Sequence, residues 1–340
     1  MKLKKQFADF YEEIRIQGES EYLKEKREVL EADIKKYFPS EMAKHDIILK
    51  KTDIEIFDQG SYKYHTTIKS NVIDRDVAVM IPLDITKHTD PRKIKGYLRD
   101  ALSHVVTREV NIKEPCVNVA YYENGEEWMH IDLPLYAKHN DNVYLARGKE
   151  FASNYCWEIA DPKGLNADLC EKIDGNAQLR RIIRYVKKWR NEKYSNSTLD
   201  HEIPPSIGLT YLVYDCFVEA KTEDGEDDLL ALQKTMSEIK KKFDLTIEDG
   251  NLVKADITCY LPVEPYSDIF AKMKESSDDY GIRFYNRLSL AVSNLTNAVN
   301  VESEHDAGIY VQKVFGEEFI APPKQTASSS VQGKKEHSFG

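Results

Sequence analysis

The most constraining feature of this 340-residue chain is an apolar stretch that carries two aspartates. Residues 72–83 are rich in β-branched and other apolar side chains, which predicts a strand. Side chains at positions i and i+2 of a strand project from the same face, so Asp74 and Asp76 project together and Arg75 projects from the other face. Adjacent carboxylates repel each other at a half-buried position, and a divalent cation is a common reason to keep them there.

A second stretch, residues 128–136, offers a third carboxylate. Its apolar residues alternate with polar ones, which predicts a half-buried strand with Asp132 on its polar face. If the two strands lie side by side, three carboxylates converge and can hold two metal ions, an arrangement that supports phosphoryl or nucleotidyl transfer. A D-x-D pair taken alone is also typical of a turn, a salt-bridged pair or a Ca²⁺ site, so this interpretation depends on the motifs around it.

A Gly-Ser pair, Gly60-Ser61, stands upstream of the two aspartates. Glycine lets the backbone approach a phosphate closely, and serine offers a hydroxyl and an N–H group. A helix that began near Tyr62 would add its N-terminal dipole to such a site. The alternative for an isolated Gly-Ser pair is an ordinary tight turn.

Composition excludes several classes of protein. A charged fraction of 31% and a hydrophobic fraction of 41% fit a soluble globular protein, and the length suits two lobes better than one core. A net charge of −10 argues against a large nucleic-acid surface, which normally needs a basic face. No apolar run approaches the ~20 residues that span a bilayer, and the N-terminus lacks the apolar region of a signal peptide, so we expect a cytoplasmic protein without a membrane span.

Cysteine usage points to a reduced protein. The five cysteines are scattered and form no C-x-x-C pair, so the sequence suggests neither a zinc site nor a disulfide framework.

The first 160 residues read as a mixture of helices and strands. The apolar spacing of residues 1–38 predicts one helix that is stopped by Pro39. The other predicted elements are a strand at 47–58, a helix at 91–106, strands at 117–122 and 129–136, and a hairpin turn at 123–125.

The second half of the chain reads as almost entirely helical, after a loose connection at residues 161–175. Residues 178–193 combine a buried apolar stripe with many cations, and such a basic helix is usually a solvated face. Two prolines precede Ser206, which predicts a helix with that serine as N-cap or first-turn residue. Further helices are predicted at 229–244, 266–275, 279–300 and 304–315.

These motifs resemble the polymerase-β-like nucleotidyltransferases, and more closely the bacterial cGAS/DncV-like nucleotidyltransferases (CD-NTases). The resemblance rests on QGSYKYHTT, DRDVAVMI and HIDLPLYA, and it is looser across residues 187–212. Arg75 departs from the small or apolar residue that is common in the middle of the D-x-D motif, but it faces away from the carboxylates.

The resemblance implies an α+β, bilobed fold. A catalytic lobe with a mixed β-sheet and helices would occupy residues 1–160 and include a long N-terminal helix that braces both lobes. A mostly helical C-terminal lobe would occupy residues 161–320, and a flexible tail would occupy residues 321–340.

The resemblance also implies the site residues. The catalytic and metal-binding residues would be Asp74, Asp76 and Asp132, with two Mg²⁺ ions as cofactors and Mn²⁺ as an alternative. The nucleotide-binding residues would be Gln59, Gly60, Ser61, Lys187 and Ser206. Two of these have alternatives, because Lys188 is one register away from Lys187, and Ser206 could serve only to cap its helix.

The implied activity is a metal-dependent cyclic oligonucleotide synthase. It would join NTPs, ATP among them, into a cyclic di- or trinucleotide second messenger of bacterial anti-phage (CBASS) signalling, with release of pyrophosphate. One alternative is another polymerase-β-like nucleotidyltransferase that acts on RNA, a protein or a small molecule. The other is a catalytically inactive nucleotide sensor, against which the intact acidic triad argues.

The C-terminal stretch ends in Gly340 and is too polar to fold alone. Some members of the family are attached to targets through a C-terminal glycine by a ubiquitin-transfer-like conjugating enzyme, and Gly340 would suit that reaction. The alternative is an ordinary frayed terminus.

Overall fold

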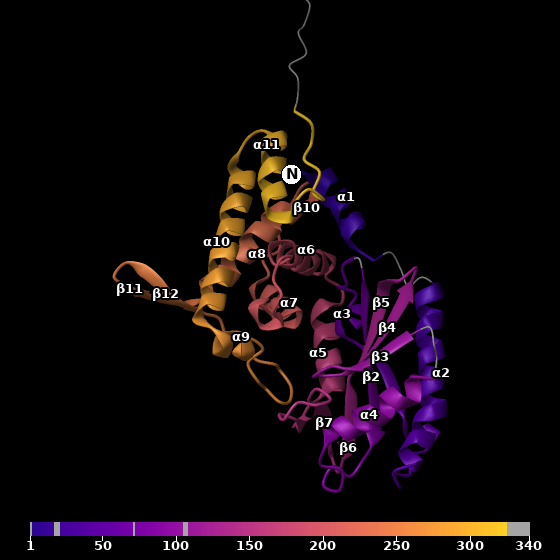
Figure 1. Ribbon diagram of the computed structural model, residues 1–340. Coiled ribbons are helices and arrows are strands. Elements are labelled where there is room, and N and C mark those ends of the chain that lie inside the picture. The colour runs from indigo at the N-terminus through magenta and orange to yellow at the C-terminus, as the bar shows by residue number, and fades with distance from the viewer. Residues whose placement is uncertain (1, 17–20, 71, 105–107, 325–340) are drawn as a thin grey trace, which may run out of the picture.

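The computed structural model describes residues 2–16, 21–70, 72–104 and 108–324 (Figure 1). The helices are α1 (Lys4–Ile14), α2 (Glu21–Ala43), α3 (Gly60–Lys63), α4 (Pro91–Leu102), α5 (Pro162–Ile173), α6 (Ala177–Lys193), α7 (Ser206–Cys216), α8 (Asp228–Lys241), α9 (Ala271–Ser276), α10 (Asp278–Asn300) and α11 (Glu304–Phe315). The strands are β1 (Glu55–Gln59), β2 (Ile73–Pro82), β3 (Arg108–Ile112), β4 (Val117–Glu123), β5 (Glu126–Leu133), β6 (Leu135–His139), β7 (Asn142–Arg147), β8 (Cys156–Ile159), β9 (Lys221–Thr222), β10 (Gly225–Glu226), β11 (Asp244–Glu248) and β12 (Asn251–Asp256).

A mixed sheet forms the first lobe, with the order β3-β4-β5-β2-β6-β7-β8 and β1 paired to β2. The first half of β2 runs parallel to β5 and its second half runs parallel to β6. Pro134 separates β5 from β6, and its carbonyl accepts a hydrogen bond from the Val79 amide at 3.0 Å. Strand β1 pairs with β2 from Asp76 to Met80, so Asp76 lies opposite Gln59 of β1 and opposite Asp132 of β5.

The predicted hairpin between β4 and β5 is confirmed. Asn124 and Gly125 both have positive φ, 52° and 84°, which is the geometry of a type I′ turn. This turn carries the chain from β4 into the strand that bears Asp132.

One face of the sheet packs against α2 and α4. The buried side chains of β2 and β5 on this face join those of the two helices in a single apolar cluster. The cluster includes Val77, Val79, Ile131, Leu133, Ile34, Phe38 and Leu98. Each fully buried side chain of this size contributes roughly 1.5–3 kcal/mol, so the helices fix the sheet from one side and leave the other face to the site.

The second lobe is mostly helical, as predicted, and has its own core. Helices α6, α7, α8, α10 and α11 pack together with one another. Two small hairpins, β9–β10 and β11–β12, were not predicted, and β11–β12 projects from the lobe (Figure 1).

The prediction of one helix stopped by Pro39 is wrong, because the described N-terminal residues form two helices. Helix α1 packs into the helical lobe, where the Phe10 and Phe315 ring centroids lie 4.7 Å apart. Helix α2 packs on the sheet and continues through Pro39 to Ala43, because Phe38 and Met42 on either side of the proline are fully buried. The N-terminal segment therefore reaches both lobes with a separate helix for each.

The expectation of a loose connection at residues 161–175 is also wrong, since α5 occupies most of it. Asp161 caps this helix by accepting a hydrogen bond from the Gly164 amide at 2.7 Å, and Pro162 follows at the first helical position. These are helix-start signals, and they outweighed the weak helix formers in the first turn.

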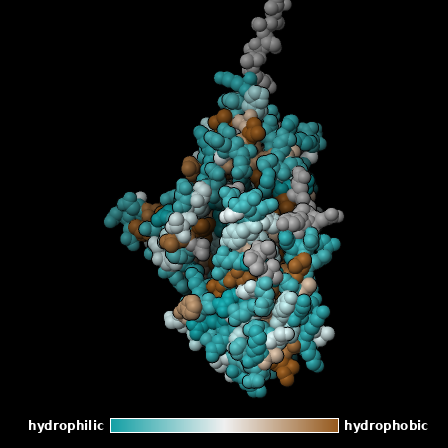
Figure 2. All heavy atoms as spheres, turned by 45° about the vertical axis from the view of Figure 1, so that its right-hand side comes forward, coloured by the Kyte–Doolittle hydropathy of each residue, from teal (hydrophilic) through white to brown (hydrophobic). Residues whose placement is uncertain are grey.

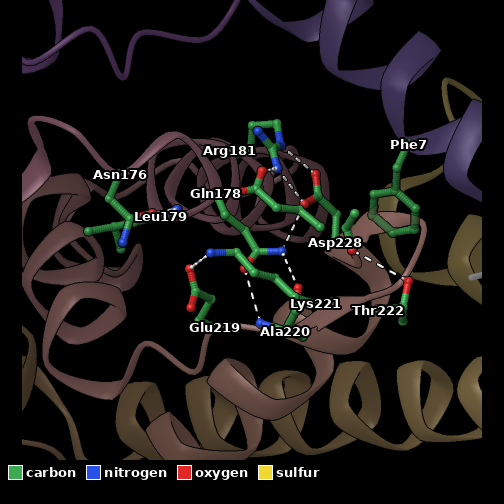
Figure 3. A network of polar contacts seen from close by, with 12 residues as sticks. Phe7, Asn176, Gln178, Leu179, Arg181, Glu219, Ala220, Lys221, Thr222 and Asp228 are labelled. Atoms are coloured by element: carbon green, nitrogen blue, oxygen red, sulfur yellow. Dashed lines mark hydrogen bonds and ion pairs between the residues drawn. The ribbon is translucent and has the colours of Figure 1, made fainter.

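A buried polar network fixes α6 within the helical lobe (Figure 3). The Gln178 side chain accepts from the Ala220 amide at 3.1 Å and donates to its carbonyl at 3.0 Å. Arg181 donates to Asp228 at 2.6 Å, and the Tyr185 hydroxyl bridges Asp228 and the Phe7 carbonyl. Such satisfied buried contacts hold a helix in one orientation, which matters because α6 also carries Lys187.

The outer surface is mainly hydrophilic on the face that Figure 2 shows, with apolar residues in small separate groups. Within the described ranges, none of the helices combines the length and the hydrophobicity needed to cross a bilayer.

Candidate active site

The parallel pairing of β2 with β5 brings the predicted carboxylates together. In its register Asp74 lies opposite His130, and Asp76 lies opposite Asp132. Oxygen and nitrogen atoms of Asp74, His130 and Asp132 lie within 4.8 Å of one another. The sequence prediction missed His130 as a site residue, although its position two residues before Asp132 on the same strand face was a usable signal.

Asp76 is half-buried beside two other carboxylates. Burial, and then the charges of Asp74 and Asp132, raise the pKa of Asp76 to about 8. In the part of the chain that the structure describes, no cation forms an ion pair with Asp76. The Asp76 carboxylate is therefore costly to ionise as it stands, and a bound cation would relieve that cost.

Gly60 has a reason to be glycine that the sequence did not reveal. Its φ is +69°, and a Cβ atom at this position would lie 2.0 Å from Asp76 Oδ2. Glycine is thus required by both the backbone conformation and the close approach of the carboxylate. This contact places the Gly-Ser turn directly against the acidic cluster.

Asp132 is oriented by one polar side chain of β4 and one from the loop that precedes β4. The Asn118 amide donates to Asp132 Oδ1 at 2.6 Å, and Lys113 Nζ lies 3.7 Å from the same oxygen. Asn118 occupies the position opposite Asp132 in the β4–β5 pairing, so the sheet itself delivers this contact. Sequence reasoning missed both residues because their approach depends on strand pairing.

His130 connects Asp74 to Glu127. Its Nε2 lies 3.2 Å from Asp74 Oδ1, and its Nδ1 lies 2.8 Å from Glu127 Oε1. The hydrogen bond with Asp74, followed by the one with Glu127, raises the pKa of His130 to about 9 against the opposing effect of burial.

A cleft of about 280 Å³ lies between the two lobes next to these carboxylates. Its walls combine residues of the Gly-Ser turn and β2 with residues of α5, α6 and α7. The predicted site residues that line it are Gln59, Gly60, Ser61, Asp74, Asp76, Lys187 and Ser206. Asp132 lies beside Asp76 on the adjacent strand, and Gly340 lies outside the described residues.

Three polar residues that the sequence prediction did not name also belong to this cleft. Tyr136 donates a hydrogen bond to Gln59 Oε1 at 3.3 Å. Tyr64 donates to Asn166 at 2.8 Å, and Asn166 in turn donates to the Asp58 carbonyl at 3.0 Å. These bonds tie α5 to the strand and turn that precede the carboxylates.

The structure shows that Lys187, and not Lys188, lines the cleft. Lys187 is buried in the cleft, where its Nζ lies 3.0 Å from Thr66 Oγ1. Burial, and then the nearby cations Arg184 and Arg190, lower the pKa of Lys187 to about 7. Lys188 instead forms an ion pair with Glu318 at 2.5 Å, so only Lys187 lines the cleft.

Ser206 is the first residue of α7 and faces the cleft. Pro205 holds the N-cap position, and within the described structure α7 receives no side-chain capping bond. Ser206 therefore does not form the hydrogen bond that a role as helix cap alone would require. The N-terminal end of α7, with its free N–H groups, lies where a phosphate would be favoured.

The segment that carries these residues is similar to a known family of proteins. A family model described as "Cyclic GMP-AMP synthase DncV-like, nucleotidyltransferase domain" matches residues 54–136. Over this segment the chain is similar to the cGAS/DncV-like nucleotidyltransferases. The matched segment contains the Gly-Ser turn and all three aspartates.

The proteins that are similar to this chain are distant from it in sequence. A cyclic GMP-AMP synthase from Escherichia albertii is 28% identical over 171 residues, which are 47% of this chain and 37% of that protein. The DncV cyclic AMP-GMP synthase of Vibrio cholerae, solved with a nonhydrolyzable GTP, has a TM-score of 0.68 at 16% identity and covers 94% of this chain and 97% of its own. CdnC from E. coli MS115-1, solved as a complex with HORMA-deltaN, has a TM-score of 0.64 at 17% identity, with 93% and 98% covered. These structural likenesses concern the fold.

The acidic cluster of this cleft fits a divalent metal. Carboxylate oxygens are the ligands that Mg²⁺ and Mn²⁺ favour, and the donor atoms of Asp74, His130 and Asp132 are already close enough for small side-chain rotations to bring them to one ion. Burial, and then the neighbouring carboxylates, raise the pKa of Asp76, and a bound cation would offset both effects.

Proposed function

We propose that this protein is a nucleotidyltransferase, a cyclic oligonucleotide synthase that joins NTPs, ATP among them, into a cyclic di- or trinucleotide with release of pyrophosphate. One observation carries the proposal: a single cleft combines Asp74 and Asp76 from one lobe with Lys187 and the N-terminus of α7 from the other. Carboxylates for metal ions and cations for phosphates are what transfer from a triphosphate requires. Two of the proteins similar to this chain are a cyclic GMP-AMP synthase and a cyclic AMP-GMP synthase, which supports the cyclic product.

The residues of the chain would act mainly by positioning and charge neutralisation. Gly60, Ser61 and Ser206 would contact the triphosphate through N–H and hydroxyl groups, and Gln59 would lie beside them. Lys187, in its charged form, would neutralise part of the phosphate charge. Two Mg²⁺ or Mn²⁺ ions held by Asp74, Asp76 and Asp132 would supply further charge neutralisation and a lowered pKa for the attacking ribose hydroxyl.

In each transfer a ribose hydroxyl oxygen forms a bond to the α-phosphorus of an NTP. The bond from that phosphorus to the β-phosphate oxygen breaks, and pyrophosphate leaves with the electron pair. Asp132 would accept the hydroxyl proton, since Asn118 and Lys113 hold its carboxylate in place. A second transfer within the linear product would close the ring.

The biological role that we propose is anti-phage signalling in the cytoplasm. CdnC, whose fold is similar, was solved with HORMA-deltaN, so the proposal includes a protein partner that regulates the enzyme.

The test is an incubation of the purified chain with all four NTPs and Mg²⁺ or Mn²⁺, followed by phosphatase and mass spectrometry. A phosphatase-resistant cyclic species is expected, and it would be absent from the variant with Asp74→Asn and Asp76→Asn. If labelled NTP instead appeared on RNA, a protein or a small molecule, the enzyme would be another kind of nucleotidyltransferase. Nucleotide binding without turnover, with or without a partner, would identify an inactive sensor.

A further inference from the structure

The acidic cluster contains an imidazole that the proposed mechanism does not use. His130 lies directly opposite Asp74 in the β2–β5 register and two residues before Asp132 on its own strand. Its ring is half-buried, and both of its nitrogen atoms face carboxylates. A histidine in this position either pairs with Asp74 alone or binds a metal ion together with the carboxylates.

The distances fit a ligand. Two ligand atoms that each lie ~2.1 Å from an ion and subtend a right angle are ~3 Å apart. His130 Nε2 lies 3.2 Å from Asp74 Oδ1, and the three donor atoms of Asp74, His130 and Asp132 lie within 4.8 Å of one another. An ion could therefore take one atom from each residue after small side-chain rotations.

The second ring nitrogen supports the same assignment. Metal-binding histidines usually donate their other N–H to a carboxylate, which fixes the tautomer and the ring orientation. Glu127 Oε1 provides that carboxylate at 2.8 Å from Nδ1, so Nδ1 can keep its proton while a bound ion replaces the proton of Nε2 and takes its lone pair.

We propose that His130 Nε2 is a metal ligand together with Asp74 and Asp132, and that it makes this site prefer a divalent transition-metal ion such as Mn²⁺ over Mg²⁺. The inference deepens the proposed function, because it assigns the metal class of the same site. Oxygen-only ligand sets suit Mg²⁺, whereas an imidazole nitrogen raises the affinity for transition ions. Glu127 is a positioning residue in this arrangement, since it acts through the His130 ring.

The experiment uses the full chain, freed of metal and without nucleotide. Mn²⁺ binding is followed by electron paramagnetic resonance, with Mg²⁺ as the competitor, and pulsed measurements on protein containing ¹⁵N-histidine test whether a histidine nitrogen contacts the ion. His130→Gln replaces the imidazole with an oxygen donor of similar length. His139→Gln is the matched control, because His139 also lies near a carboxylate, Asp84 at 3.6 Å, but on β6 outside the cluster.

A histidine-nitrogen coupling is expected in the wild-type protein and in His139→Gln, and its loss is expected in His130→Gln. The Mn²⁺ over Mg²⁺ preference should fall roughly 10-fold or more in His130→Gln, and Mn²⁺ affinity should fall by a similar factor in Glu127→Ala. Bound Mn²⁺ without nitrogen coupling, or an unchanged preference in His130→Gln, would overturn the inference.

Product analysis of the same samples in Mg²⁺ separates this inference from the proposed function. A cyclic product without nitrogen coupling would leave the synthase in place and remove His130 from the ligand set. Nitrogen coupling without any transfer product would keep the metal site and remove the synthase.

Discussion

Strands β2 and β5 supply the carboxylates of the cleft, whereas helices α6 and α7 supply its cation and its helix N-terminus. On the strands, alternate residues face the site, so Asp74 and Asp76 share a face by local geometry alone. On α6, successive residues point about 100° apart, and only packing decides that Lys187 rather than Lys188 faces the cleft. The two halves of the site therefore differ in how they are specified, and we expect them to fail differently when mutated.

The largest loss of activity should come from mutations in the strand half of the site, which carries the carboxylates. Replacing Asp74 and Asp76 with Asn should lower product formation by at least ~10³-fold, because the metal ligands are lost. The fold should persist with an equal or higher melting temperature, since the variant removes a carboxylate whose pKa burial and its neighbours raise to about 8. Product yield and thermal unfolding measured on the same samples test both statements.

Asp84→Asn is the control for this variant. Asp84 lies just beyond β2 and is held by Thr86 rather than by the cluster. Substantial turnover in the double variant, or an equal loss in the control, would contradict the assignment of the strand half.

Gly60→Ala should produce the next largest effect. The new Cβ would meet Asp76 Oδ2 at 2.0 Å, so the carboxylate must move, and we expect roughly a 10²-fold loss of turnover. Gly125→Ala is matched to it, because Gly125 also has a positive φ, +84°, but open space around it. Both variants should lose about 1 kcal/mol of stability or more from backbone strain, and only Gly60→Ala should lose activity.

Lys187→Met tests the helical half. Loss of a buried cation in the cleft should weaken NTP binding by roughly 10–100-fold with little change in metal binding. Lys188→Met should behave like the wild type, because Lys188 pairs with Glu318 outside the cleft. Titration of NTP into the two variants shows which lysine contacts the phosphates. Equal effects from both variants would show that neither lysine contacts phosphate selectively.

The pH dependence of NTP binding follows from the pKa of Lys187, which burial and nearby arginines lower to about 7. Above that pH the free amine is increasingly neutral, so a phosphate must bind together with a proton. Affinity should therefore fall as the pH rises from 7 to 9, by up to about tenfold per unit. Lys187→Arg should flatten this dependence, because arginine stays charged throughout. A slope that survives in Lys187→Arg would have to come from another group.

The smallest effect should come from Ser206→Ala. The hydroxyl makes no capping bond within the described structure, so stability should change by less than about 0.5 kcal/mol, while KM rises by a few-fold. Ser303 provides the opposite case, since its side chain accepts from the Asp306 amide and caps α11. Ser303→Ala should cost about 1 kcal/mol without changing KM, as kinetics and chemical unfolding would show.

Much of the fold could be predicted where local signals were strong. The strand at β2, the hairpin before β5 and the helix at α6 were all visible as periodicity or turn residues. Helix α5 was missed despite its Asp-Pro start, because Gly164 and Asn166 weaken the helical pattern of its first turns. The prediction ended α2 too early, at Pro39, because proline usually stops a helix. In the structure, burial of Phe38 and Met42 outweighs that local preference.

The sequence by itself determined that Asp74 and Asp76 share one strand face and that Asp132 and His130 share another, because alternation depends only on the geometry of a few consecutive residues. The tertiary structure decided that these two faces meet, that Gly60 packs against Asp76, and that Lys187 reaches them from the other lobe. Those contacts join residues far apart in the chain, and their choice depends on how whole elements bury their apolar surfaces.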